Sequence, residues 1–215
     1  MTESPIARHQ IFLLSPAYCG GRRAKMLLRP DSEMALARDL RAGRLTLGAA
    51  FAFMSGLYFR GKLAYAKAFD PSLTATCVIT PTRGLQPPGL LVTPEVLREF
   101  ADVDVHADEE RYRTVIELDV HELARRLPRE ARVILLGSVA TGKYVDVLSP
   151  LLGNRLYYPS AFVGRGDMSR GGLLLRSSRS GVELEYAPIA AGVRPRGARP
   201  GKLGPERLAR LRAVL

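Results

Sequence analysis

The chain has 215 residues, of which 47% are hydrophobic, and a formal net charge of +11, a composition typical of a globular protein with one large domain. No apolar run approaches the ~20 residues of a membrane-spanning helix, the N-terminal MTESPIARHQ lacks the pattern of a signal peptide, and the cysteines and histidines have no zinc-binding spacing. We therefore expect a cytoplasmic protein with no membrane partner and no dedicated metal site.

The positive charge is unevenly distributed, because residues 95–122 are acidic overall whereas residues 192–215 are strongly basic. A basic surface attracts polyanions, of which nucleic acid is the most common. The excess of arginine over lysine, with abundant alanine and leucine, is equally typical of a protein from a GC-rich genome. The charge alone therefore leaves open whether nucleic acid is a partner.

In chain order, the apolar or alternating segments expected to form strands are residues 10–15, 74–80, 132–137, 155–162 and 183–189. Helices are expected at residues 24–28, 33–41, 46–69, 144–152 and 172–178, and one opens at Thr93-Pro94-Glu95. Residues 109–127 fit both a helical stripe and a strand-like alternation, and their length favours a helix. The alternation predicts an α/β fold with a three-layer, mostly parallel Rossmann-like or flavodoxin-like sheet and helices on both faces.

The domain organisation follows from the composition along the chain. Residues 1–191 are expected to form a single α/β domain. Residues 192–215 are rich in proline, glycine and arginine, which predicts a mobile basic tail. A short helix is expected at its end, over residues 205–215.

The loops that follow the strands share a composition. They read SPAYCGGRR, TPTRG, SVATGK and GRGDMSRGG, and each combines small residues with at least one arginine or lysine. Ligands of parallel sheets bind beyond the carboxyl ends of the strands, where helix N-termini add donors. We therefore expect a phosphate or other anion site there; the alternative is that these are only the small polar turns of any α/β protein. The candidate ligand-binding residues are Arg22, Arg23, Gly137, Ser138, Lys143, Arg165, Ser169, Arg170 and Gly171.

The run FVGRGDMSRGG, residues 162–172, is the richest of these loops and contains the candidate catalytic residue, Asp167. Neighbouring guanidinium groups hold a carboxylate ionised, which favours a role in orienting or activating water. An equally good alternative is that Asp167 bridges Arg165 or Arg170 and only stabilises the loop. Backbone amides of Gly171 and Gly172 are expected to bind ligand oxygens.

Residues 137–143, GSVATGK, match the phosphate-binding pattern GxxxxGK and lie between a strand and a helix. The next residue is Tyr144, where that motif requires Ser or Thr to hold Mg²⁺. A simple turn at the end of a strand is therefore favoured over a nucleotide-hydrolysing P-loop. Cys19 precedes an expected helix, a position that can lower a thiol pKa. No histidine lies near it in the sequence, so a small buried residue is favoured over a nucleophile.

Three stretches together, FMSGLYFRGKLAYAKAF (53–69), LLGSVATGKYVD (135–146) and YPSAFVGRGDMSRGGLLLR (158–176), resemble a group of uncharacterised conserved bacterial proteins. The resemblance extends along the chain to about Ile189. It implies a bacterial cytosolic protein, and it implies no activity and no catalytic residue.

The pattern of residues predicts a protein that recognises an anion, most simply a phosphate. The favoured interpretation is an enzyme, a hydrolase or transferase, that acts on a nucleotide, nucleoside or nucleic acid; no cofactor is indicated. One alternative is a non-catalytic nucleic-acid-binding or accessory protein that uses the basic tail. A second alternative is an atypical P-loop NTPase or kinase.

Overall fold

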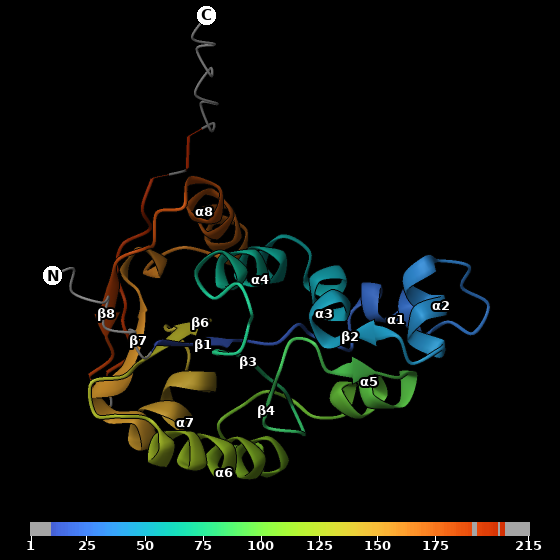
Figure 1. The fold of residues 1–215 in the computed structure, drawn as a ribbon, viewed down its shortest axis with the longest axis horizontal. Helices are drawn as coiled ribbons and strands as arrows, with labels where there is room; N and C mark the ends of the chain where they lie inside the picture. The colour runs from blue at the N-terminus through green and yellow to red at the C-terminus, as the bar shows by residue number, and fades with distance from the viewer. Residues whose placement is uncertain (1–9, 191–192, 202, 205–215) are drawn as a thin grey trace, which may run out of the picture.

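The computed structural model describes residues 10–190, 193–201, 203 and 204, and they form a sheet with helices on both faces (Figure 1). The sheet has six strands in the order β4-β3-β1-β6-β7-β8. Four neighbouring strands, β3, β1, β6 and β7, are parallel, and β4 and β8 pair antiparallel at the two edges. The bounds are β1 Gln10–Leu14, β3 Thr76–Ile79, β4 Leu85–Gln86, β6 Arg132–Leu136, β7 Leu156–Pro159 and β8 Tyr186–Pro188. The predicted three-layer α/β fold is confirmed.

The central strands β1 and β6 are apolar after their first residue because both faces of the sheet are covered. Leu13 of β1 pairs in register with Leu135 of β6, and both side chains belong to the core on one face. Their neighbours Leu14 and Leu136 point to the core on the other face. A strand buried on both sides gains from an apolar residue at every position, which explains the runs QIFLL and RVILL.

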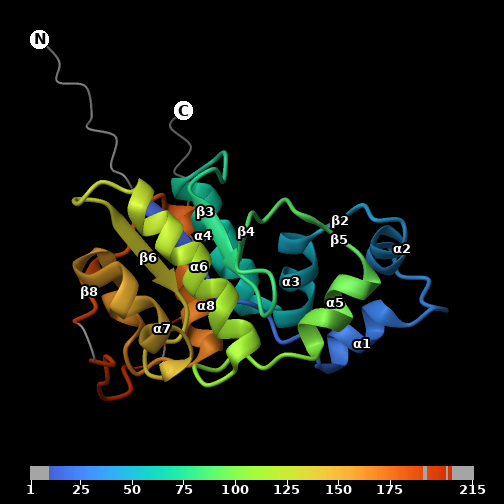
Figure 2. The same ribbon diagram turned by 90° about the horizontal axis from the view of Figure 1, so that it is seen from below.

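Two pairs of helices form the outer layers (Figures 1 and 2). Helices α4 (Leu57–Phe69) and α8 (Asp167–Ser180) cover one face, whereas α6 (Glu110–Arg126) and α7 (Gly142–Leu152) cover the other. Short 3-10 helices, Gly153–Arg155 and Ser160–Phe162, flank β7. Among the described helices, none is long and apolar enough to cross a membrane.

A helical lobe lies beside the sheet in both views (Figures 1 and 2). It consists of α1 (Arg22–Leu28), α2 (Ala35–Arg41), α3 (Leu47–Ser55) and α5 (Pro94–Ala101), with a small antiparallel ribbon of β2 (Leu45–Thr46) and β5 (Leu91–Val92). Its buried side chains, such as Phe51 and Leu97, are continuous with the core under α4. The lobe and this face of the sheet therefore share one hydrophobic core.

Helices α4 and α8 pack very closely because a glycine lies on each side of their contact. A Cβ atom added at Gly61 would lie 2.7 Å from the carbonyl oxygen of Gly171, and one added at Gly171 would lie 2.8 Å from that of Leu57. Neither distance leaves room for a methyl group. These two glycines let the backbones of the helices touch.

The order of the parallel strands creates a switch point. Strand β1 pairs with β3 on one side and with β6 on the other, so the chain passes first to one side of β1 and later to the opposite side. The connections that leave β1 and β6 therefore diverge at the carboxyl ends of these strands. Open α/β sheets bind their ligands at such a point.

Several predicted elements differ in detail from the structure. The helix expected over residues 46–69 is divided into α3 and α4 at Gly56, whose φ of 64° is a left-handed conformation open to glycine. Helix α8 begins at Asp167 rather than at Gly172, so the second half of FVGRGDMSRGG is helical. The ambiguous residues 109–127 form a helix, α6, as favoured.

The described part of the basic tail contacts the domain. Arg194 forms an ion pair with Asp146 of α7, and the guanidinium of Arg165 donates to the carbonyl of Gly201 at 3.3 Å. These residues were expected to be mobile; in the structure they lie along α7 and the loop before α8. The predicted helix over residues 205–215 lies outside the described residues.

Candidate functional site

A cavity of about 790 Å³ lies at the switch point, between the carboxyl ends of β1 and β6 and the helical lobe. The loop after β1 contributes Ser15 to Cys19, and the loop after β6 contributes Ser138 and Thr141. The lobe supplies Met54, Phe100 and the segment that follows α5, with Asp104 and His106. The cavity thus lies where the topology predicts a ligand.

Among the predicted site residues, five line this cavity: Arg22, Arg23, Ser138, Lys143 and Asp167. They come from three separate loops, after β1, β6 and β7. The structure therefore brings together residues that are up to 145 positions apart in the sequence, from Arg22 to Asp167. Their juxtaposition is a property of the fold rather than of one motif.

The cationic side chains in the cavity are available for a ligand. Within the described part of the chain, Arg22 and Lys143 make no side-chain hydrogen bond or ion pair. Arg23 donates to the carbonyl of Phe53 at 3.1 Å and keeps its charge uncompensated. Three positive charges without an acidic partner favour an anionic ligand.

Two long helices also begin at the cavity. Neither α7 nor α8 has a hydrogen bond from its N-cap side chain to its first turn, and Lys143 and Asp167 lie in those turns. Thr141, the N-cap of α7, instead lies 3.4 Å from Ser138, hydroxyl to hydroxyl. Both hydroxyls line the cavity, so they and the free amides of α7 add neutral donors to the cations.

The remaining predicted residues lie outside the cavity lining. Arg165 donates to the carbonyl of Ala161 at 2.9 Å and to Ser169 at 3.1 Å, so both side chains hold the turn before α8. Arg170 is buried and lies 3.6 Å from Asp167. Gly171 lies inside α8 against α4, where its amide belongs to the helix rather than to a ligand loop. Gly137 packs against Ser15.

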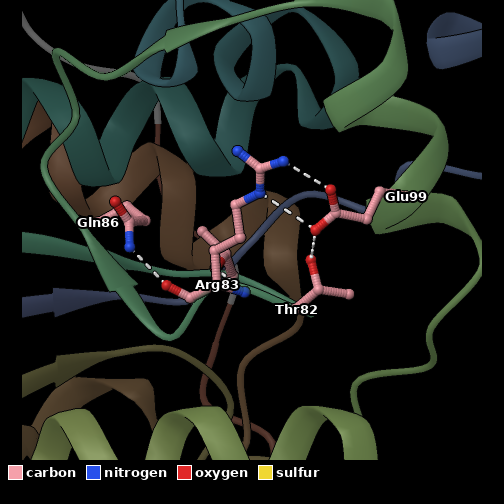
Figure 3. A network of polar contacts seen from close by, with 5 residues as sticks. Thr82, Arg83, Gln86 and Glu99 are labelled. Atoms are coloured by element: carbon pink, nitrogen blue, oxygen red, sulfur yellow. Dashed lines mark hydrogen bonds and ion pairs between the residues drawn. The ribbon is translucent and has the colours of Figure 1, made fainter.

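The expectation that all four loops supply a cation is wrong for the loop after β3. Glu99 of α5 accepts hydrogen bonds from Arg83 at 3.1 and 2.6 Å and another from Thr82, and Gln86 donates to the carbonyl of Arg83 (Figure 3). The hydrogen bonds from Arg83 hold the pKa of Glu99 below its usual value. Arg83 thus connects the β3–β4 turn to the lobe, and only Pro81 of this loop lines the cavity.

The sequence analysis missed the most unusual residue near the cavity, Lys62 of α4. Its side chain is 1% exposed, and its Nζ donates to the carbonyl of Ser15 at 2.5 Å and lies 2.8 Å from Ser15 Oγ. Burial lowers the pKa of Lys62 to about 7, and this effect exceeds the opposing influence of Asp167. Lys62 lies behind Ser15, and Ser15 lines the cavity.

A signal for Lys62 was present in the sequence. Tyr58, Lys62, Tyr65 and Ala66 have the spacing of one helical face, and all four are buried. A lysine on an otherwise apolar stripe is rare because a buried ammonium group is costly. The apolar residues of this helix alone did not show which face is buried.

Two tyrosines complete the floor of the cavity. Tyr58 is 6% exposed, and its Oη makes no hydrogen bond of good geometry with the described residues. The guanidinium of Arg170 lies close enough to favour the charged phenolate, so it is a nearby group with a poorly aligned contact rather than a full partner. Tyr144 is also buried, and burial raises the pKa values of both phenols. Tyr144 occupies the position at which a P-loop would hold Mg²⁺, next to Ser15 rather than to a carboxylate.

No family model, curated protein or solved structure matches the chain. The chemistry of the cavity is therefore inferred from its own residues. In the described ranges, no group of three or more His, Cys, Asp or Glu side chains is placed to bind a metal ion. Cys19 is buried, as favoured from the sequence, and burial raises the pKa of its thiol to about 12, which excludes the activated thiol that was the alternative.

The lining of the cavity combines cations, hydroxyls and helix N-termini with the side chains of Asp104 and His106. The carboxylate of Asp167 is 70% exposed. Such a lining can bind an anionic group and can also accept from a hydrogen-bond donor of the same ligand.

Proposed function

We propose that the chain binds a phosphorylated ligand, a nucleotide or a phosphorylated nucleoside, in this cavity and acts on it as a hydrolase or transferase. The observation that carries the proposal is the convergence of Arg22, Lys143 and Asp167, from three loops, on one cavity at the switch point of the sheet. Arginine and lysine without acidic partners match phosphate oxygens. We also propose that the protein comes from a bacterium and is located in the cytoplasm.

The size of the cavity and the other residues that line it favour a nucleotide over a bare phosphate. A volume of about 790 Å³ is within the range of small-molecule sites. Tyr18 lines the cavity with its side chain 71% exposed, so its ring offers a face on which a base can stack. Asp104 offers an acceptor for a ribose hydroxyl or a base amino group.

Asp167 is the residue proposed to orient water. Its only described ion-pair partner is Arg170, at the long distance of 3.6 Å, and most of the carboxylate faces solvent. An exposed acceptor at the mouth of an anion site can hold a water beside the bound phosphate. The alternative, a bridge that stabilises the start of α8, remains open because of the same contact with Arg170.

Binding measurements test the proposal. Calorimetric titration of the full chain with ADP and with inorganic phosphate is expected to show binding, tighter for ADP. The variant Arg22→Ala/Lys143→Ala should lose about 1.5–3 kcal/mol for each contact, or roughly 10- to 150-fold in Kd for each residue. The matched control is Lys67→Ala, an exposed cation of α4 outside the cavity lining. Equal affinities of both variants for ADP would refute the site.

Non-catalytic nucleic-acid binding is the second candidate, and it is favoured by the net charge of +11 and the exposed arginines of the tail. It makes a different prediction. Deletion of residues 192–215 would abolish affinity for single-stranded DNA and flatten its salt dependence, while ADP binding would be unaffected. A P-loop NTPase, the third candidate, requires that Lys143→Ala alone abolish nucleotide binding.

A further inference from the structure

We propose that Ser15 is a nucleophile that attacks the phosphorus of the bound substrate, and that Lys62 is the general base that takes its proton. This inference rests on one part of the proposed function, namely that the cavity binds a phosphate ester. It assigns the reaction to covalent phosphoryl transfer through a serine.

The position of Ser15 supports this role. It follows the last residue of β1, at the switch point, and its side chain lines the cavity that holds Arg22, Ser138 and Lys143. Its Oγ donates to the carbonyl of Leu136 at 3.3 Å and accepts from Lys62 Nζ at 2.8 Å. The hydroxyl is thus held between β1, β6 and α4, on rigid elements rather than on a flexible loop.

The contacts of Lys62 orient its amine toward Ser15. One N–H is held by the carbonyl of Ser15 at 2.5 Å, and the Oγ of the same residue lies at 2.8 Å. In the structure Lys62 Nζ donates to Ser15 Oγ, and that hydroxyl donates to the carbonyl of Leu136. When Lys62 is neutral, its lone pair accepts the hydroxyl proton after a rotation about the Cβ–Oγ bond of Ser15. Lys62 does not line the cavity, so it reaches a substrate only through Ser15.

The surroundings of Lys62 allow both charge states. From its own helix, the rings of Tyr58 and Phe59 lie 4.3 and 5.0 Å from Nζ. From α8, the charges that act on it are Asp167 and Arg170, which form a pair of opposite sign. Burial favours the neutral amine at rest, and the faces of the two rings stabilise the ammonium formed when the proton arrives.

The Oη of Tyr58, which makes no well-aligned hydrogen bond with the described residues, is an independent sign of a ligand at this place. A buried hydroxyl without a hydrogen bond costs about 1–3 kcal/mol, and Tyr58 lines the cavity beside Lys62. A phosphoryl oxygen bound above Ser15 would accept a hydrogen bond from Tyr58. The free-energy cost of burying the Tyr58 hydroxyl is then offset only when the phosphorylated ligand is bound.

The reaction balances in two steps. Ser15 Oγ forms a bond to phosphorus, the bond from phosphorus to the leaving oxygen breaks with its electron pair, and the serine proton moves to Lys62 Nζ. Water, oriented by Asp167, then attacks the phosphoserine; Oγ leaves and takes the proton back from Lys62. The proton that the water loses passes through Asp167 to solvent, from which the leaving oxygen takes one.

A fluorophosphonate tests this assignment without knowledge of the natural substrate. Diisopropyl fluorophosphate forms an Oγ–P bond with an activated serine and releases fluoride, and the adduct is located by mass spectrometry. In the full-length chain we expect one adduct, on the peptide that contains Ser15, and none in Ser15→Ala. The labelling rate should rise with pH and level off above an inflection near 7, the pKa of Lys62.

Variants of Lys62 separate a base from a structural support. Lys62→Arg keeps the positive charge but cannot take a proton near neutral pH, and Lys62→Met keeps the length without the amine; both should label at least 100-fold more slowly. If either variant fails to fold, the pH profile of the unmodified chain still decides. No adduct at Ser15, or a pH-independent rate, would overturn the proposal.

The two proposals fail in different ways. If ADP binds to the full chain and to Ser15→Ala but Ser15 is not labelled, the inference is wrong and the proposed function stands. If Ser15 is labelled in a Lys62-dependent manner but neither ADP nor phosphate binds, the nucleotide function is wrong and the nucleophile stands.

Discussion

Tyr58 and Tyr112 have the same side chain in opposite situations. Tyr58 Oη is buried and makes no well-aligned hydrogen bond within the described part of the chain, whereas Tyr112 Oη donates to the carbonyl of Lys143 at 3.2 Å. Removal of a buried hydroxyl that makes no hydrogen bond removes the cost of its desolvation. Removal of a hydroxyl that donates to a carbonyl leaves that carbonyl without a partner. These two residues therefore respond differently to the same substitution.

We expect Tyr58→Phe to raise the free energy of unfolding by about 1 kcal/mol and Tyr112→Phe to lower it by about 1 kcal/mol. Urea denaturation followed by circular dichroism measures both. Tyr58→Phe should also weaken ligand binding in calorimetry, despite the gain in stability. A loss of stability in Tyr58→Phe would mean that its hydroxyl has a partner in solution.

Lys62 gives the stability of the protein a distinctive dependence on pH. Its pKa is about 7 when folded and 10.5 when free, so between these values the unfolded chain binds more protons. The free energy of unfolding therefore rises with pH in this window, by at most about 1.4 kcal/mol per pH unit. Above pH 9 the trend reverses in part, because burial raises the pKa values of Cys19 and Cys77 from 9.0 and the unfolded chain loses those protons first.

The window from pH 7 to 9 isolates this effect. Denaturation of the unmodified chain and of Lys62→Met at several pH values should give a rising stability only for the former. The same slope in both would show that Lys62 stays charged when buried.

At the scale of elements, the α4–α8 contact depends on two glycines that leave no room for a side chain. Gly171→Ala should destabilise the protein by about 1–3 kcal/mol, because the added methyl group meets the backbone of α4. The neighbouring Gly172→Ala is the matched control, since its Cβ would be 3.5 Å from its nearest neighbour; it should be neutral or stabilising by up to ~1 kcal/mol, because glycine disfavours helices. Thermal unfolding of both variants checks the contrast.

The elements were largely predictable because their patterns are local. The buried strands β1 and β6 and the capped start of α5 follow from residues that are adjacent in sequence. The break at Gly56 and the early start of α8 at Asp167 depend on how α3, α4 and α8 pack, which no single segment encodes. The α4–α8 contact therefore explains Gly171, which the sequence analysis assigned to a ligand.

The site was predictable only in part for the same reason. Loop composition located the cations of the β1 and β6 loops, because topology places those loops at one edge. It did not separate Arg22, which has no side-chain partner among the residues that the structure describes, from Arg83, which is paired with Glu99 on a distant helix. Lys62 and Tyr58 were missed since their importance comes from burial beneath Ser15, a contact between residues 47 positions apart.

At the scale of the whole molecule, the tail should be dispensable for folding. Its described contacts with the domain include the half-exposed ion pair of Arg194 with Asp146 and the bond from Arg165 to Gly201, and surface pairs contribute about 0–1 kcal/mol. A chain that ends at residue 191 should therefore fold and keep its affinity for ADP. A melting temperature lower by more than about 10 °C would show that the tail belongs to the domain.

A longer truncation provides the control. A chain that ends at residue 182 lacks β8 and with it the hydrogen bond between the hydroxyls of Tyr186 and Tyr65, 2.5 Å apart, and the partner of Gln10, Glu183. It should fail to give a cooperative thermal transition. Together the two chains locate the end of the folding unit between residues 182 and 191.

The two outer strands of the sheet limit how copies of this protein can meet. Strands β4 and β8 have two and three residues, and β8 ends in Pro188, which has no N–H to offer. A strand from another molecule would find too few groups to extend the ladder. Concentrated solutions should therefore resist fibrillar, edge-to-edge aggregation through this sheet. That resistance is useful for the preparation of crystals or NMR samples.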